Sequence, residues 1–115
     1  MKNYLSINSV IPSFNKVLNV PGDKSLSIRW ILLASQAIGK SKAYNLLESD
    51  DVISAIVSMR KLGVKIIKRR SFYEIRGVGL SGFSHKNNLN LNAGNSGTFA
   101  RLLCGTLAGN VKNVK

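Results

Sequence analysis

The apolar and polar positions at the start of the chain predict two short strands followed by a long apolar helix. Residues 3–11 and 15–20 have the composition of strands and are separated by Pro12. Residues 24–38 then carry apolar side chains on more than one face, so we expect a helix that is buried on most sides. Gly39 follows this run and is the residue at which we expect the helix to end.

The middle of the chain continues with a strand, an amphipathic helix and a hairpin. Residues 42–47 suit a short strand. The next helix is expected to begin after Ser49, a good N-cap, and to end at Gly63, with apolar positions at helical spacing between them. Residues 64–70 and 72–79 predict a β-hairpin. The order strand, helix, strand, helix, strand, strand predicts one compact α/β unit.

A similar pattern begins again after a polar loop. Residues 89–109 predict a short strand, a glycine-rich turn and a second apolar helix. Laying the second turn over the first matches three positions: Gly94 with Gly22, Asn95 with Asp23, and Arg101 with Arg29. We interpret this stretch as the start of a second copy of the same unit. Because a unit interrupted after its first helix leaves an apolar face uncovered, we expect the chain to be part of a longer protein.

The balance of charge limits the classes of partner. The chain has 115 residues, of which 44% are hydrophobic, and its 17 basic and 5 acidic residues give a net charge of +12. Such a balance suits nucleic acid, a membrane surface or a small polyanion. A small basic nucleic-acid-binding module would gather its basic residues on one face with exposed aromatics between them, whereas here they look scattered along the sequence. We therefore expect small anionic ligands and no nucleic acid.

Cysteine and histidine are too few for several kinds of site. Cys104 is the one cysteine and lies in an apolar run, so we expect a buried, inert thiol and a reducing compartment. His85 is the one histidine, which leaves little for a zinc site or a Ser-His-Asp triad, and we expect no metal. The chain shows no secretory signal and no apolar run long enough to cross a membrane. We expect a cytoplasmic protein that does not contact a membrane.

The stretch "VPGDKSLSIRW" places cations at the opening of a helix, where the macrodipole already favours an anion. Lys24 brings a mobile ammonium and Ser25 a hydroxyl, and Arg29 lies one turn later on the same face as Ser25. A guanidinium there can hold a carboxylate or phosphate through two parallel hydrogen bonds. The alternative is that these cations are solvated, or that Arg29 pairs with Asp50 or Asp51. The opening suits a small ligand with more than one anionic group.

The stretch "NAGNSGT" is a second turn of small residues at the start of a helix. Its backbone N–H groups, together with the side chains of Asn95, Ser96 and Thr98, offer a cradle for an anion. Gly97 would let a phosphate approach the main chain closely. An ordinary helix-entry loop is the alternative, because a glycine-rich turn alone is a weak signal. Two such openings favour an anion site made of two parts.

These motifs together resemble one family of enzymes. "PGDKSLSIR", "LLASQAIGKSKAYNLLESDDV" and "GNSGTFAR" resemble the EPSP synthase family (3-phosphoshikimate 1-carboxyvinyltransferase), and the resemblance runs from about residue 18 to residue 109. The related UDP-N-acetylglucosamine enolpyruvyl transferase is similar in fold and is the nearest alternative. It usually lacks the Lys-Ser pair in the first turn, so Lys24 and Ser25 favour the EPSP synthase family.

The resemblance implies a domain organisation. Members of the family are α/β (α+β) proteins with two globular domains, each built of three βαβαββ units, and the substrates bind between them. Residues 1–19 would belong to the other, mostly absent domain, and residues 20–115 to a partial substrate-binding domain. Within the latter, unit one would span about residues 20–80 and the start of unit two about residues 89–115.

The resemblance also implies an activity and residue roles. The family enzyme is a transferase of the shikimate pathway, in aromatic amino acid biosynthesis, and moves the enolpyruvyl group of phosphoenolpyruvate to the 5-hydroxyl of shikimate 3-phosphate without a cofactor. By this resemblance Lys24 is catalytic and touches both substrates, Ser25 and Arg29 bind shikimate 3-phosphate, and Asn95 and Gly97 line the phosphoenolpyruvate pocket. We expect the complete enzyme to be a monomer and the 115-residue chain alone to be an inactive fragment.

Overall fold

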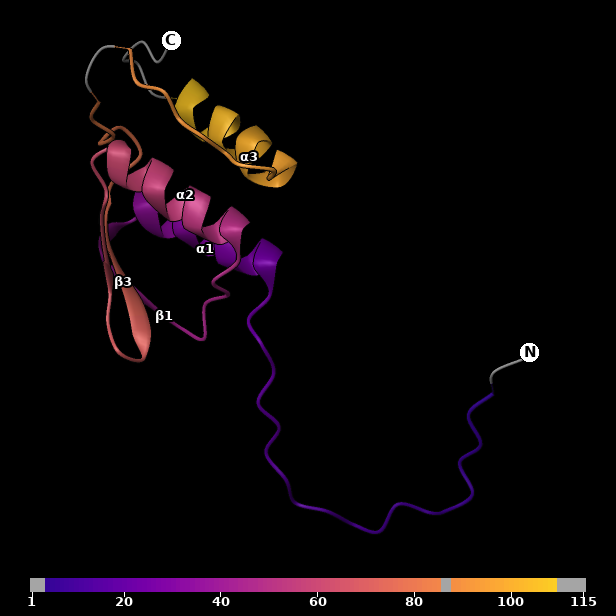
Figure 1. The fold of residues 1–115 in the computed structure, drawn as a ribbon. Helices are drawn as coiled ribbons and strands as arrows, with labels where there is room; N and C mark the ends of the chain where they lie inside the picture. Colours follow the sequence, from indigo (N-terminus) through magenta and orange to yellow (C-terminus); the bar gives the residue numbers. More distant parts are fainter. Residues whose placement is uncertain (1–3, 86–87, 110–115) are drawn as a thin grey trace.

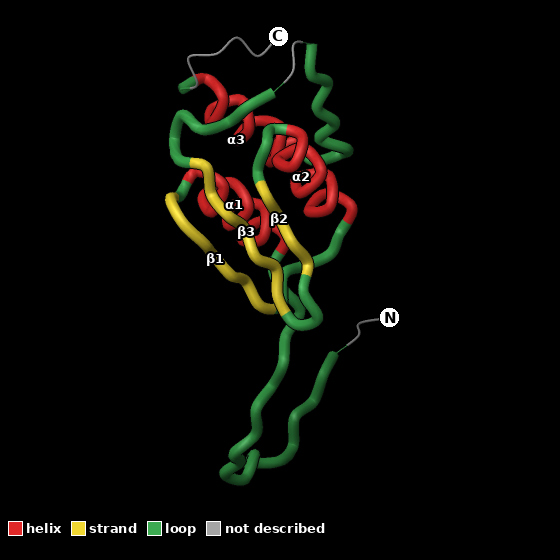
Figure 2. The backbone as a smooth tube through the Cα atoms, turned by 90° about the vertical axis from the view of Figure 1, so that its left-hand side faces the viewer, coloured by secondary structure: helices red, strands yellow, loops and turns green. Residues whose placement is uncertain are grey.

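The computed structural model describes residues 4–85 and 88–109, which form an antiparallel sheet with helices packed on one face (Figure 1). The elements in chain order are α1 (Lys24–Gln36), β1 (Ile38–Tyr44), α2 (Asp50–Lys61), β2 (Lys65–Lys68), β3 (Phe72–Val78) and α3 (Gly97–Ala108). The strand order is β1-β3-β2, and α1 and α2 lie behind the sheet in Figure 2. The predicted α/β (α+β) class is confirmed. No helix in this described part is long and apolar enough to cross a membrane.

The chain before α1 differs from its prediction. Residues 4–20 form no strand, and they run away from the rest of the molecule in Figure 1. Their apolar side chains are exposed, as for Val10 at 93% and Val17 at 88%. A strand needs a neighbour to pair its backbone N–H and C=O groups, and the β1-β3-β2 sheet does not pair with this segment. The strands predicted at residues 3–11 and 15–20 are therefore wrong for the described residues.

The boundary between α1 and β1 also differs from the prediction. α1 ends at Gln36, and the strand begins at Ile38 rather than at residue 42. Gly39 has a φ of +100° but lies inside β1, so it does not end the helix. The reason is Gly77 on β3, where a Cβ would collide with the carbonyl of Ala37 and lie 2.5 Å from that of Ala34. Because glycine lets the end of α1 sit directly on the sheet, the chain enters β1 almost at once.

The core lies between the sheet and the helices, and α1 is buried on fewer sides than its sequence predicts. Ile28 and Ile31 are completely buried, whereas Leu26 and Leu33 are each 68% exposed. Trp30 is partly buried and packs against the edge of the core. Within the described chain, the sheet, α2 and α3 cover only part of the surface of α1.

The second helix and the hairpin agree with their predictions. Ser49 is the N-cap of α2, although its side chain makes no capping hydrogen bond in the described structure. Gly63 has a φ of +87°, and the Val64 N–H donates to the Met59 carbonyl at 3.1 Å, which gives the helix a Schellman-type end. The predicted hairpin is formed by β2 and β3, which pair in an antiparallel register.

The third helix is confirmed, but two details around it were predicted wrongly. Residues 89–92 do not form a strand, and the alternating Leu89 and Leu91 instead pack partly against the core. Cys104 is exposed rather than buried, because the buried face of α3 is carried by Phe99 and Leu103. The N-cap of α3 is Ser96, so the structural counterpart of the α1 cap lies one residue beyond Asn95.

Candidate anion-binding site

The N-termini of the three helices lie at one end of the molecule, on the right in Figure 1. A side-chain ion pair between Lys24 and Asp51 joins the first turns of α1 and α2. The turn before α3 contacts α2, since a Cβ on Gly94 would lie 3.0 Å from the Ser54 hydroxyl oxygen. Free N–H groups and the partial positive charge of helix ends favour anions. We call the first turns of α1 and α3, with the loops that precede them, the α1 opening and the α3 opening. The fold thus brings both openings to the same end of the molecule.

Gly22 allows the loop after β1 to lie against the start of α1. A Cβ at this position would collide with the carbonyl of Asn45 and lie 2.8 Å from the amide nitrogen of Leu47. Two hydrogen bonds hold the loop there: Asn45 Nδ2 donates to the Val20 carbonyl at 2.6 Å, and the Leu47 N–H donates to Ser27 Oγ at 3.1 Å. This close approach places the first turn of α2, with its acidic residues, beside the opening of α1.

Two carboxylates, those of Asp23 and Asp51, balance the positive charge at the N-terminus of α1. Asp23 is the N-cap, and its Oδ1 accepts a hydrogen bond from the Leu26 N–H at 2.7 Å. Lys24 Nζ lies 3.0 Å from Asp51 Oδ2, and the lysine side chain is 54% exposed. The structure therefore pairs Lys24, and not Arg29, with an acid of the α2 opening. An anionic ligand at this end would share the Lys24 ammonium with Asp51.

Arg29 and Ser25 lie together on one face of α1, as their spacing predicts. The exposed guanidinium of Arg29 turns back toward the helix start, and its Nη1 donates to the Ser25 carbonyl at 3.2 Å. Among the described residues, Arg29 forms no ion pair with a carboxylate. This guanidinium is available to a carboxylate or a phosphate.

The opening of α3 has a different construction. Ser96 Oγ accepts from the Phe99 N–H at 3.2 Å, and completely buried Phe99 anchors the helix in the core. Asn95 and Gly97 are both exposed. Gly97 begins the helix with an ordinary negative φ, so the backbone conformation itself does not require glycine. Its missing side chain leaves the main chain open to close approach.

Arg101 is a candidate that the sequence analysis assigned no role. Its Nη1 lies 3.6 Å from the position of a Cβ on Gly97, so the guanidinium folds back toward the opening of α3. The spacing of residues in the sequence could have indicated this position for Arg101. Arg101 follows Gly97 by four residues, the same one-turn spacing that separates Arg29 from Ser25. Each opening therefore carries an exposed arginine one turn into its helix.

A polar cluster fixes the loop between β1 and α2 to the hairpin. Lys68 Nζ lies 2.7 Å from Glu48 Oε1, and Tyr73 Oη donates to the same oxygen at 2.9 Å. The hydrogen bonds from Lys68 and then from Tyr73 lower the pKa of Glu48, and the bond to Glu48 raises the pKa of Lys68. The pKa of Tyr73 is raised mainly by burial and further by its bond to Glu48. The cluster holds the loop that precedes the acids of α2.

Comparison with known proteins places the chain in a family. The family model of EPSP synthase (3-phosphoshikimate 1-carboxyvinyltransferase) matches residues 11–115. The 3-phosphoshikimate 1-carboxyvinyltransferase of Sulfurihydrogenibium sp. (strain YO3AOP1) is 45% identical over 92 residues, which are 80% of this chain and 21% of that protein. The enzyme of the same name from Streptococcus suis (strain 98HAH33) is 39% identical over 105 residues, which are 91% of this chain and 24% of that protein.

Comparison of the fold with solved structures points to the same family. The solved EPSP synthase from Acinetobacter baumannii matches with a TM-score of 0.71 at 37% identity, and the match covers 78% of this chain and 20% of that chain. The chain belongs to the EPSP synthase family. It spans about a fifth to a quarter of the length of the two relatives, at 21% and 24%.

Proposed function

We propose that this chain forms part of an enzyme that transfers the enolpyruvyl group of phosphoenolpyruvate to the 5-hydroxyl of shikimate 3-phosphate. Family membership supports the reaction, and the gathering of two anion-favouring helix openings at one end of the molecule supports the site. Both substrates carry several negative charges. In this reaction the hydroxyl oxygen bonds to C2 of phosphoenolpyruvate, a tetrahedral intermediate forms, and inorganic phosphate then leaves.

The α1 opening is proposed to bind shikimate 3-phosphate and to contact the reacting atoms. Arg29 and Ser25 share a face of α1, which suits two-point binding of a phosphate. Lys24 stands at the very start of the helix, and its ammonium would stabilise negative charge that develops between the two substrates. Asp51 holds the Lys24 ammonium at 3.0 Å, so substrate binding would draw the lysine away from its carboxylate partner or share it.

The α3 opening is proposed to bind phosphoenolpyruvate. The exposed positions of Asn95 and Gly97 support this role, since an amide side chain and an uncovered main chain can both donate to phosphate oxygens. Arg101 joins them as a proposed charge partner, because its guanidinium lies beside Gly97. The opening lacks a carboxylate cap, so it would not repel an anion as the cap of α1 does.

The remaining expectations concern the whole protein. We infer that residues 1–19 belong to a second domain, since the apolar side chains described in this segment are exposed and would be buried by a part of the protein outside this chain. Residues 20–115 would be the partial substrate-binding domain, with unit one at about 20–80 and unit two starting at about 89. The complete enzyme is proposed to be a cytoplasmic monomer that needs no cofactor.

A chimera tests the proposed reaction. This chain replaces the matching segment of the Acinetobacter baumannii EPSP synthase, and phosphate release is measured with each substrate present or omitted. We expect release only when both phosphoenolpyruvate and shikimate 3-phosphate are present, and no release from the 115-residue chain alone, because part of a site cannot position both reactants. Acceptance of UDP-N-acetylglucosamine in place of shikimate 3-phosphate would favour the alternative transferase. Turnover by the chain alone would contradict the proposal that it carries only part of the site.

A further inference from the structure

The sheet gathers basic side chains that look scattered in the sequence. The register pairs Lys40 of β1 with Arg76 of β3, and Arg76 in turn with Lys65 of β2. All three side chains are exposed, whereas Ile75 and Ile66 at alternating positions are buried, so the row lies on the face of the sheet opposite the helices. Figure 2 shows that the helices cover only the other face. We call this line of three residues the cationic row. Neighbouring strands lie about 4.8 Å apart, so the row spans roughly 10 Å across the sheet.

The cationic row has little negative charge near it. The three strands carry five basic residues and one acid, Glu74, which pairs with Lys42 in the register next to the row. In the part of the chain that the structure describes, the ion pairs are those of Lys24 and Lys68, and none includes a member of the row. Like charges directly opposite one another destabilise a sheet. The row therefore costs stability that a bound polyanion would recover.

Two aromatic side chains, the exposed Tyr44 and the half-buried Phe72, lie on the same face as the row. Tyr44 and Phe72 are cross-strand partners, with ring centroids 5.5 Å apart, and Tyr44 is 66% exposed. Lys42 Nζ lies 5.0 Å from the centroid of the Phe72 ring. From Lys40 to Tyr44 the strand rises roughly 13 Å, and the Lys42–Glu74 pair lies between the row and the rings. Nucleic acid bases stack on an exposed ring such as that of Tyr44, while neighbouring cations contact the phosphates.

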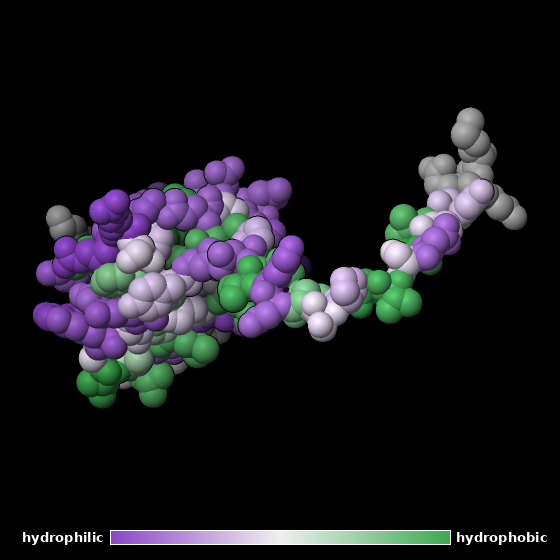
Figure 3. Space-filling view, turned by 90° about the horizontal axis from the view of Figure 1, so that it is seen from below, coloured by the Kyte–Doolittle hydropathy of each residue, from purple (hydrophilic) through white to green (hydrophobic). Residues whose placement is uncertain are grey.

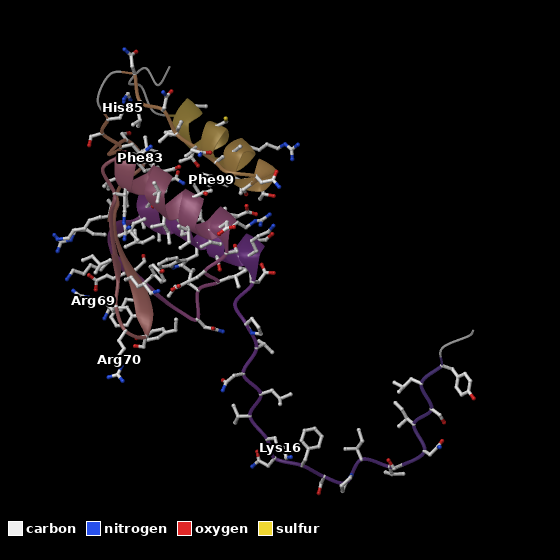
Figure 4. The ribbon with its side chains drawn as sticks, in the orientation of Figure 1. Lys16, Arg69, Arg70, Phe83, His85 and Phe99 are labelled. Carbon is white, nitrogen blue, oxygen red and sulfur yellow. The ribbon has the colours of Figure 1, made fainter. Side chains whose placement is uncertain are left out.

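The basic surface continues past the aromatic pair. Arg69 and Arg70 are exposed at the tip of the β2–β3 hairpin, which follows the end of the sheet where the rings lie (Figure 4). In the space-filling view hydrophilic residues line the left edge of the molecule, and a smaller hydrophobic cluster lies at its lower left (Figure 3). Cations thus lie on both sides of the Tyr44–Phe72 pair along the strand direction.

We propose that the outer face of the β1-β3-β2 sheet binds single-stranded nucleic acid, contrary to our expectation from the sequence, in which these basic residues are far apart. Lys40, Arg76 and Lys65 contact backbone phosphates, and Tyr44 stacks on a base. Charge complementarity favours a polyanion, and the aromatic pair favours one with accessible bases. A membrane surface would use the cations but would give Tyr44 no base to contact. This binding is separate from enolpyruvyl transfer, because the helix openings and the outer face are different surfaces of the molecule.

Fluorescence anisotropy with a labelled oligothymidylate of about 12 nucleotides tests the proposal. In the double variant Lys40→Gln/Lys65→Gln we expect at least a tenfold loss of affinity at low salt. Each lost phosphate contact should lower the slope of log affinity against log salt by about 0.7, so the double variant should lose about 1.4. The matched control Lys16→Gln/Lys61→Gln removes the same charge from other surfaces and should lose less than threefold. Thermal melting checks that all variants fold.

Tyr44→Ala separates base stacking from charge alone. We expect about a tenfold loss of oligothymidylate affinity, and little change for heparin, which has charges but no bases. Equal losses in the row variant and the charge control would overturn the proposal, because binding would then follow net charge. It would also be overturned by an unchanged affinity in Tyr44→Ala, or by tighter binding to anionic phospholipid vesicles than to the oligonucleotide. None of these outcomes bears on the chimera assay of phosphate release.

Discussion

The openings of α1 and α3 lie at the same end of the molecule but use different chemistry to face an anion. At α1 a carboxylate caps the helix, and Lys24 is held by Asp51, so charges of both signs stand close together. At α3 a serine hydroxyl caps the helix, and the guanidinium of Arg101 lies beside the exposed backbone at Gly97. The α1 opening therefore presents charged side chains to an anion, whereas the α3 opening presents an accessible main chain.

Under the proposed function, this difference leads us to expect that the two openings have different roles. A lysine that already has a carboxylate partner can change partners as charge develops, which suits a group that acts during the reaction. A bare backbone with a fixed cap changes little, which suits a group that holds a substrate in place. Substitutions at the two openings should therefore have different kinetic signatures in the chimera.

The largest expected effect is that of Lys24→Met at the first opening. The side chain is about half exposed and contributes no core packing, so the chimera should fold normally. Loss of one preorganised charge donor commonly lowers kcat by about 10²–10³-fold. Steady-state assays of phosphate release measure this, with Lys61→Met as a control for the loss of one exposed lysine. A kcat within threefold of the parent would show that Lys24 is not catalytic.

The next prediction compares how much a glycine-to-alanine substitution at each opening lowers the stability of the fold. Gly22→Ala should destabilise the fold by about 1–3 kcal/mol, because its Cβ would meet the backbone of Asn45 and Leu47. Gly97→Ala should change stability by no more than about 0.5 kcal/mol, because its nearest neighbour would be the flexible Arg101 at 3.6 Å. Urea unfolding of both variants measures the difference. Equal losses would mean that Gly97 has a role in the fold that the structure does not show.

Gly97→Ala also tests the proposed binding role of the second opening. A methyl group against the exposed main chain should hinder phosphoenolpyruvate and raise its KM by about tenfold, which corresponds to about 1.4 kcal/mol. The KM for shikimate 3-phosphate should change much less, because that substrate is assigned to Ser25 and Arg29. Varying each substrate in turn separates the two. A parallel rise in both KM values would remove Gly97 from the phosphoenolpyruvate pocket.

The smallest effect concerns the pH dependence of stability near the first opening. The pKa of Glu48 is lowered in the folded chain by Lys68 and Tyr73, so its stabilising effect is present above its unfolded value of 4.5 and is lost as the pH falls below that. The pair is exposed to solvent, so we expect a small effect. Thermal melts from pH 6 to pH 3 should show a steeper loss for the parent chain than for Glu48→Gln. Identical slopes would show that the cluster does not stabilise the loop.

Much of the local structure could be predicted because its signals lie close together in the sequence. The Ser49 to Gly63 frame of α2 and the hairpin at residues 64–79 were both predicted from neighbouring residues. The pairing of Ser25 with Arg29 on one face also follows from helical spacing alone. Such features depend on caps, periodicity and turns, which act within a few residues.

The sequence by itself therefore determined the helices, the hairpin and which residues stand at the two openings. Only the tertiary structure decided what these elements contact. It left residues 4–20 without a strand partner, exposed Cys104, paired Lys24 with Asp51, and aligned Lys40, Arg76 and Lys65 across the sheet. Each of these outcomes depends on residues far apart in the chain, and no local propensity specifies which distant strand or helix becomes a neighbour.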